Sequence, residues 1–377
     1  MLQSCDNDEP DTRQLREVHL VLGAQTYSDI TITHAAAPGT RALPDGFVTY
    51  SELYPQGLPE YAQIYAYLAK AGSNPPETGL FAYEDISGTR TWSSHINIDA
   101  GETYYIYGFM PKEDAGNITI TPYTNPNDAT ISGYQHGAVM TINGLNAVTP
   151  ADVCVIVGVR GNDNNTDAIT SLDMASRLGK FDYTTQDAGD YVYLLIDHLY
   201  CGLNFEMKVD AAYNALRTIK VKQLKLIANN GSSTVKKVNA VVTLVANQTY
   251  SGTQPLNPLS DEAGGSISFT TAETGDDVEP AMLWNDATNP KVLSTEKTSF
   301  LGCFAPATNR NYILESTYDI YDRKGNLIRA NCTAQNAFTA PSGMKPGQNH
   351  TYQITVNPTY LYMLSDPDLD NPVFTLE

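Results

Sequence analysis

Apolar and polar residues alternate with a period of two in the segment 218–226 (Thr-Ile-Lys-Val-Lys-Gln-Leu-Lys-Leu). Side chains of a strand point alternately to the two faces of a sheet, so this pattern predicts a half-buried antiparallel strand. Further short strands are predicted at 103–109, 153–159 and 349–356, and a hairpin is predicted with its turn at 323–326 (Arg-Lys-Gly-Asn). Convincing long helical patterns are absent. The 24 tyrosines favour strands, while 27 glycines and 21 prolines supply turns. We therefore expect an all-β fold.

The pattern of the chain changes near residue 191. A loose polar stretch, 180–190, precedes the almost wholly apolar segment 191–200. A chain of 377 residues is long enough for two domains of about 150 residues each. We predict two consecutive antiparallel β-sandwiches, 17–190 and 191–358, with a segment 1–16 before them and a tail 359–377 after them.

The formal net charge of -19 and the pI near 4.6 restrict the partners of this chain. Such a chain is repelled by phosphate backbones and by anionic lipid headgroups, so nucleic acid is not an expected partner. No stretch approaches the roughly 20 apolar residues that span a bilayer. Any membrane attachment is therefore expected to come from a covalent lipid.

The residues Leu2-Gln3-Ser4-Cys5 resemble a bacterial lipobox, in which the cysteine is diacylated. The acidic run after Cys5 resembles the signal that exports lipoproteins to the outer surface in Bacteroidetes-type bacteria. The charged and apolar parts of a signal peptide are missing, so we expect Met1 to be a truncated or misassigned start. The alternative is an ordinary free thiol near a chain end.

Sequence patterns of common enzymes and metal sites are missing. No two of the six histidines have metal-ligand spacing, and there is no GxSxG, HExxH or P-loop motif. The pair Glu113-Asp114 has the chemistry that a glycosidase needs, but in so acidic a chain solvated surface is the better interpretation. We expect no catalysis, no metal and no cofactor.

The remaining cysteines leave an alternative open. We favour buried free thiols, with a Cys303–Cys332 disulfide as the alternative. The widely spaced cysteines in question are Cys154, Cys201, Cys303 and Cys332.

A second alternative concerns the run 366–371 (Asp-Pro-Asp-Leu-Asp-Asn), whose aspartates have the i, i+2, i+4 spacing of calcium loops. A calcium loop needs glycine at the position of Asn371. We therefore prefer a kinked connector, bent by Pro367 and Pro372.

Several segments together resemble the fimbrillin family, the type V pilins of Bacteroidetes-type bacteria. Their order and spacing cover the whole chain. The segments are the lipobox, Thr40-Arg41-Ala42, the run from Asp197-His198-Leu199-Tyr200 to Thr218-Ile219-Lys220, and the strand 349–356 with the tail that follows it. The resemblance implies transthyretin-like sandwich domains.

The resemblance also implies a maturation path. Cys5 would be lipidated at the outer membrane, and an arginine-specific surface protease would cut after Arg41, which makes Ala42 the new N-terminus. The removed piece, residues 5–41, contains Val18, Leu20 and Leu22, which alternate as a groove filler must. Arg13 and Arg16 are rival cleavage sites that would leave this strand attached.

A neighbouring subunit's C-terminal tail would then enter the empty groove, which is β-augmentation. Two groups of tail residues have the required alternation, and the alternative is that the tail pairs back on its own second domain as an edge strand. The donor residues are Tyr360, Tyr362 and Leu364 in the first group, and Val373 with Phe374 or Leu376 in the second.

The expected function is that of a structural pilin subunit, a shaft subunit as first choice, which polymerises head to tail into adhesive fimbriae at the cell surface. Its partners would be other pilin subunits, the protease and the outer membrane. The alternative is a surface glycan-binding lipoprotein, in which Trp92, Trp284 and exposed tyrosines would stack on sugar rings.

Overall fold

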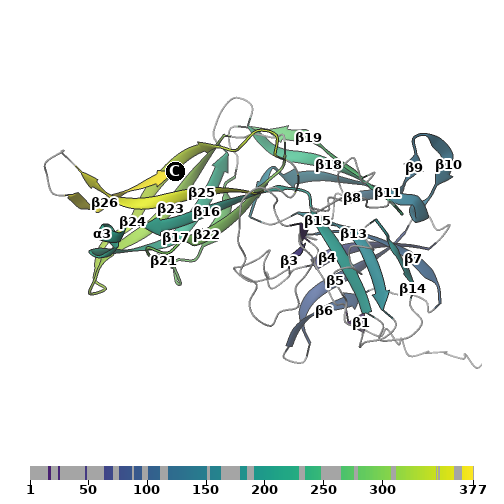
Figure 1. Ribbon diagram of the computed structural model, residues 1–377, viewed down its shortest axis with the longest axis horizontal. Coiled ribbons are helices and arrows are strands. Elements are labelled where there is room, and N and C mark those ends of the chain that lie inside the picture. Colours follow the sequence, from purple (N-terminus) through teal and green to yellow (C-terminus); the bar gives the residue numbers. More distant parts are fainter. Residues whose placement is uncertain are drawn as a thin grey trace, which may run out of the picture.

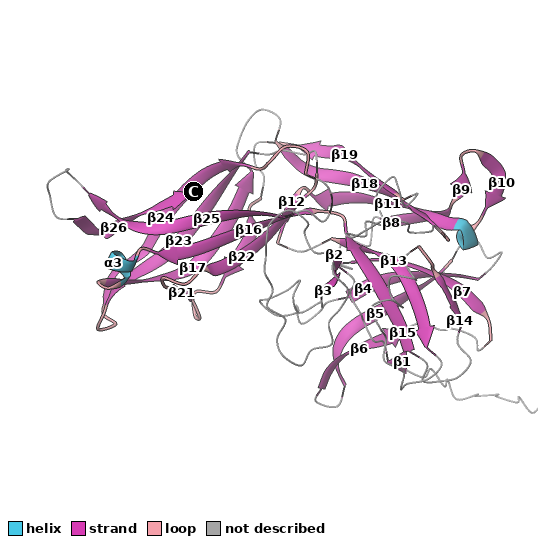
Figure 2. Ribbon diagram, viewed as in Figure 1, coloured by secondary structure: helices cyan, strands magenta, loops and turns pink. Residues whose placement is uncertain are grey.

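The computed structural model is built almost entirely from β-strands (Figure 1), which confirms the expected all-β fold. Figure 2 shows short helical turns between them. In the described part of the chain, no helix is long and apolar enough to cross a membrane. The structure describes residues 16–17, 24–25, 47–48, 63–70, 76–86, 89–95, 101–110, 118–150, 153–162, 179–184, 191–228, 234–247, 265–275, 279–306, 311–344, 346, 349–360 and 367–376.

The first sandwich pairs a large sheet with a smaller one. The large sheet has the order β1-β6-β5-β4-β7-β13-β15, and β14 also pairs with β7. The smaller sheet has the order β19-β18-β11-β8. The strands of the large sheet are β1 (Arg16–Glu17), β4 (Gln63–Lys70), β5 (Glu77–Ile86), β6 (Thr89–His95), β7 (Thr103–Met110), β13 (Cys154–Asn162), β14 (Asp182–Thr184) and β15 (Tyr191–His198). Those of the smaller sheet are β8 (Ile118–Pro122), β11 (Gly137–Asn146), β18 (Val235–Val245) and β19 (Ser266–Thr274).

The core of the first sandwich lies between these two sheets. Alternate residues of β11 and β18, such as Met140, Ile142 and Val242, are completely buried against Tyr107 and Phe109 of β7. Burial of one such side chain contributes about 1.5–3 kcal/mol, so the alternation of apolar residues decides which face of each strand points inward.

The second sandwich consists of two five-stranded sheets. One has the order β12-β22-β16-β25-β26, and the other has the order β20-β17-β23-β24 with β21 paired to β17. The strands of the first are β12 (Val148–Thr149), β16 (Cys201–Val209), β22 (Thr298–Phe304), β25 (Asn349–Tyr360) and β26 (Pro367–Leu376). Those of the other are β17 (Arg217–Ala228), β20 (Ala281–Asn285), β21 (Lys291–Leu293), β23 (Asn311–Asp322) and β24 (Leu327–Thr339).

The alternation in 218–226 and the predicted hairpin at 323–326 are both confirmed in the second sandwich. Ile219, Val221, Leu224 and Leu226 of β17 all point into its core. At the hairpin between β23 and β24, Gly325 adopts a φ of 86°, a conformation that glycine accepts without a steric penalty.

Short elements complete the fold. The helical turn α3 (Ala211–Asn214) begins at Asp210, whose side chain accepts a hydrogen bond from the backbone N–H of Tyr213 at 3.0 Å. Two small hairpins pair β2 (Ala24–Gln25) with β3 (Phe47–Val48), and β9 (Thr124–Asn125) with β10 (Asp128–Ser132).

The chain passes between the sandwiches several times. β15 begins at residue 191, where we expected the second domain to start, but it pairs with β13 in the first sandwich. β18 and β19 also return to the first sandwich, because Val238, Ala240, Val242 and Leu244 supply one side of its core. Strand pairing therefore does not divide the chain at residue 191, and several crossings link the two cores.

Candidate functional site at the C-terminal edge strand

β25 and β26 form the part of the second sandwich that bears on the expected donor tail. β25 pairs in parallel with β16, with Gly202 opposite Asn349 and Val209 opposite Val356. On its other side β25 pairs antiparallel with β26, with Ile354 opposite Leu376 and Val356 opposite Phe374. β26 ends the order of this sheet, so it is an edge strand. The alternative that the tail pairs back on its own domain is thus what the structure shows for 367–376.

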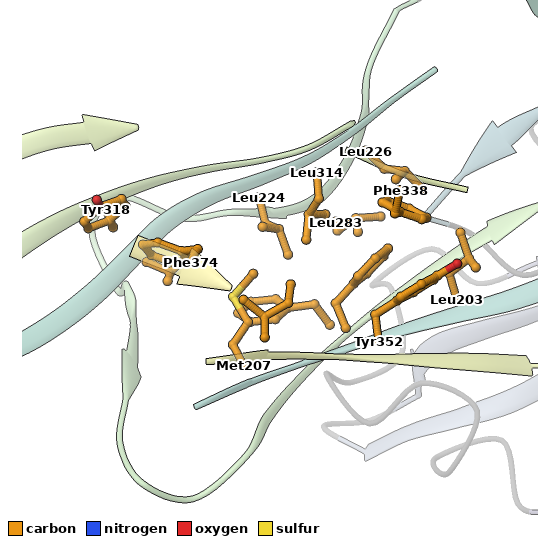
Figure 3. Close-up of a cluster of buried hydrophobic side chains, with 14 of the residues drawn as sticks. Leu203, Met207, Leu224, Leu226, Leu283, Leu314, Tyr318, Phe338, Tyr352 and Phe374 are labelled. Carbon is orange, nitrogen blue, oxygen red and sulfur yellow. The ribbon is translucent and has the colours of Figure 1, made fainter. Parts of the chain in front are cut away.

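Phe374 connects this edge strand to the opposite sheet. Its side chain is buried (5% exposed), and its ring centroid lies 4.8 Å from that of Tyr318 on β23. The carbonyl of Phe374 accepts a hydrogen bond from the Asn336 side chain of β24 at 2.6 Å. Figure 3 shows Phe374 at the end of the buried cluster, next to Tyr318. Through Phe374, β26 therefore joins its own sheet to the opposite sheet of the sandwich.

The pKa of Tyr318, the partner of Phe374, reflects its burial. Burial, together with the nearby Cys332 thiol, raises the pKa of Tyr318 to about 12. The hydroxyl is therefore neutral at physiological pH, and the ring acts as an apolar partner of Phe374.

β25 is held more firmly than an edge strand, because its apolar residues lie deep in the core. Ile354 and Val356 are fully buried. The ring of Tyr352 stacks on that of Phe205, with 5.8 Å between the ring centroids. The Tyr352 hydroxyl donates a hydrogen bond to the carbonyl of Thr339 at 2.8 Å. Both sheets therefore fix β25 independently of β26.

The sequence of β26 is typical of an edge strand that pairs weakly. Pro367 and Pro372 have no backbone N–H, which restricts them to edges, strand starts and bulges. The register of β25 and β26 shifts between Asn357 and Thr359. The strand also contains Asp368 and Asp370, and charged residues in an edge strand discourage further strand pairing.

The structure divides the predicted donor residues between three places. Tyr360 is the last residue of β25, opposite Pro367. Tyr362 and Leu364 lie outside the described residues. Val373, Phe374 and Leu376 all belong to β26. Residues 367–371 of the expected connector fall within the bounds of β26, but the pairing with β25 passes from Val373 directly to Asp368, so the strand is irregular in this run.

The predicted processing residues Cys5, Arg41 and Ala42, and the groove fillers Val18, Leu20 and Leu22, lie outside the described residues. The structure describes four residues before Arg41, in two short strands. Arg16 and Glu17 of β1 pair with Ser94 and Ser93 of β6 at the edge of the large sheet. β2 pairs with β3, which lies on the other side of Arg41 in the chain.

The structure also describes some of the other residues that the sequence singled out, including the cysteines and Trp284. Cys154, Cys201, Cys303 and Cys332 are buried and form no disulfide with one another, as expected. The described residues contain no group of three or more histidine, cysteine and acidic side chains that could hold a metal. Glu113, Asp114 and the side chain of Trp92 are not described. Trp284 packs against the second core, and the Lys291 ammonium lies 4.5 Å from its ring centroid, so Trp284 is not an open stacking platform for a sugar.

Sequence reasoning missed Tyr318 and Asn336, which receive Phe374. The alternation of 311–322 predicts a strand with Tyr318 on one face. No local pattern indicates that a residue 56 positions later would cover this face. A period-two pattern shows which face of a strand is apolar, but not which distant segment packs on that face.

The comparisons with known proteins find similar solved structures. No protein-family model matches the chain, and no curated protein matches it. A putative cell adhesion protein from Bacteroides fragilis NCTC 9343 has 12% identity over 96% of this chain and 97% of its own, with a TM-score of 0.41. A fimbrial protein from Bacteroides vulgatus ATCC 8482 has 14% identity over 96% and 99%, with a TM-score of 0.32. The tip fimbrial protein Mfa3 from Porphyromonas gingivalis has 8% identity over 84% and 93%, with a TM-score of 0.23.

Proposed function

We propose that this protein is a fimbrial subunit of the cell surface, which polymerises by exchanging its C-terminal strand between copies. The observation that carries the proposal is β26: an edge strand with two prolines and two aspartates, closed over its own core at Phe374. The resemblance of the N-terminal and C-terminal segments to fimbrillins supports the same function.

In this proposal the tail has two alternative positions. Before assembly, β26 covers its own second sandwich. After the protease cuts at Arg41, the segment 5–41 leaves the first sandwich and opens a groove. The tail of a neighbouring copy then fills this groove by β-augmentation. Because the contact is heterologous and does not close on itself, it produces a filament.

The energetics explain why cleavage must come first. Releasing Phe374 from its site costs about 1.5–3 kcal/mol of apolar burial, together with the backbone hydrogen bonds of β26. Exchange is favourable only when the receiving groove returns at least as much. An uncut first sandwich offers no free groove, so the uncut protein remains monomeric. Lipidation at Cys5 would keep the uncut protein at the outer membrane.

An arginine-specific protease tests both steps. We expect a fragment whose mass corresponds to a cut after Arg41, followed by filaments in electron micrographs. An Arg41→Lys variant is the matched control for cleavage, and it should stay uncut at this position and monomeric.

A second variant separates cleavage from exchange. A chain that ends at Tyr360 keeps all of β25 and lacks β26. We expect it to be cut normally and to form no filaments. If the shortened chain polymerises like the full chain, the tail is not the donor and the proposed function is wrong.

A further inference from the structure

The outer face of the second sandwich carries an apolar patch at one end. The exposed large apolar side chains among the described residues are Ile131, Leu216, Val292, Leu327 and Ile328, and all except Ile131 lie at this end. Val292 and Leu327 are more than half exposed, at 54% and 53%. Among the described residues few large apolar side chains are exposed, and a cluster of four at one end of a sandwich is typical of a protein interface.

Strand register shows that these residues are neighbours. Val292 of β21 is opposite Lys220 of β17, and Leu327 of β24 is opposite Tyr321 of β23. The Lys220 ammonium lies 4.2 Å from the centroid of the Tyr321 ring, which joins the two pairs across the sheet. Ile219, Leu293 and Ile320 beside them are buried in the core, so the residues that alternate with them face outward. We call Leu216, Lys220, Val292, Tyr321, Leu327 and Ile328 the distal patch.

Basic residues flank the distal patch. They are Arg217 at the start of β17, Arg323 and Lys324 in the turn between β23 and β24, and Arg329 on β24. One carboxylate lies in the same turn. Asp322 accepts hydrogen bonds from the backbone N–H groups of Lys324 and Asn326 at 2.8 Å each, and its negative charge offsets one of these four basic residues.

Two other carboxylates on the same face are already paired. Asp319 lies 2.9 Å from the Lys222 ammonium, and Glu315 lies 3.2 Å from that of Lys225. The end of the sheet that holds the distal patch is therefore locally basic, in a protein whose net charge is -19.

The acidic charge that would complement this patch lies in the first half of the same chain. Residues 1–200 contain 25 Asp and Glu but 9 Lys and Arg, whereas residues 201–377 contain 17 Asp and Glu and 14 Lys and Arg, so most of the excess negative charge lies in the first part. Glu77, Glu102 and Asp128 are exposed acidic residues of the first part. A second copy of this chain thus offers the opposite charge, and opposite charges favour encounter and orientation of two surfaces.

The position of the patch fits a head-to-tail contact. Figure 1 places α3, which leads directly into β17, at the end of the second sandwich away from the first sandwich. We propose that the distal patch docks on the acidic first sandwich of a second copy, as a contact additional to strand exchange. This inference rests on the proposed function, because it adds a second contact to the same filament.

Charge reversal tests the contact. In the variant Lys220→Glu with Lys324→Glu, the patch loses its basic character. The control, Lys208→Glu with Lys297→Glu, makes the same charge change in the opposite sheet of the second sandwich, on β16 and just before β22. Both proteins are first checked for an unchanged circular dichroism spectrum and unfolding midpoint. The readout is filament growth after arginine-specific cleavage, followed by light scattering.

We expect the patch variant to grow at least tenfold more slowly than the control variant at about 50 mM salt, with a much smaller difference at about 500 mM, where charges are screened. Equal growth of the two variants at low salt would overturn the patch contact. If growth is equal but the patch variant loses binding to an immobilised sulfated polysaccharide, the occupant is an acidic glycan and the inference is equally wrong.

The chain that ends at Tyr360 distinguishes this failure from failure of the proposed function. If filament growth requires β26 but its rate is unaffected by the charge reversal, only the patch contact is wrong. If filaments form without β26 and are slowed by the charge reversal, strand exchange fails and the patch contact stands. If the cleaved full chain neither forms filaments nor self-associates in sedimentation at low salt, both are wrong.

Discussion

Phe374 shows how one side chain can hold a whole edge strand. Its ring packs on Tyr318 of the opposite sheet, and its carbonyl accepts a hydrogen bond from Asn336. In the proposed exchange this strand would later leave, and opening of an edge strand that is held at one aromatic site leaves the rest of the core in place.

The first residue-scale prediction concerns this anchor. Replacement Phe374→Ala should reduce the free energy of opening of β26 by about 3 kcal/mol, since a buried aromatic ring is lost. Hydrogen exchange measures this as faster exchange of the β26 amides, while those of β16 keep their protection. Val292→Ala, at a site that is 54% exposed, is the matched control and should change little. Unchanged exchange in Phe374→Ala would show that the ring does not hold the strand.

The second residue-scale prediction concerns alkaline pH. The pKa of Tyr318 is raised from 10.0 to about 12 by burial, so the folded state keeps a proton that the unfolded state has lost. Stability from this group is complete below pH 10 and is lost as the pH rises from 10 towards 12. Urea unfolding at several pH values measures the loss. Tyr318→Phe should decline less over this window, although Tyr67, whose pKa is also raised to about 12, contributes a similar decline to both proteins.

Individual elements differ in how far the sequence predicts them. The strand 218–226 and the turn at Gly325 are local features, a period-two pattern and a glycine with positive φ, and both are found as expected. The glycines of segment 137–146 leave no clear strand pattern in the sequence, yet this segment is β11, a central strand of the smaller sheet. The pairing of β26 on β25 and the return of β18 to the first sandwich depend on contacts between distant segments, and no local pattern contains them.

Gly137 explains how β11 accommodates its glycines. Its φ is 133°, and a Cβ at this position would overlap the carbonyl oxygen of Leu244 on β18. We expect Gly137→Ala to lower the unfolding free energy by about 3 kcal/mol, because backbone strain and steric overlap add. Gly325→Ala is the control, since Gly325 also has positive φ but its Cβ would meet nothing within 4 Å. Chemical denaturation of both variants checks this, and equal losses would contradict the steric argument.

At the scale of the whole molecule, two sandwiches share crossing strands while the tail adds one removable strand to the outer end of a sheet. In the proposed filament, the two connected cores would carry force along the subunit, and the edge strand would be the part that is exchanged. Removal of β26 should therefore leave both cores folded. The chain that ends at Tyr360 is expected to keep one cooperative thermal transition at a slightly lower midpoint, and a lost transition would show that β26 is part of the indispensable core.

The most direct test of strand exchange is to lock the tail to its own domain. Asn357 and Val373 are opposite each other on β25 and β26, at the separation that a disulfide spans. The variant Asn357→Cys with Val373→Cys, oxidised and then cut by the arginine-specific protease, should remain monomeric and should form filaments after reduction. The single variants should form filaments in both conditions. Filaments of the oxidised, locked protein that grow at the rate of the reduced protein would contradict donation of the tail.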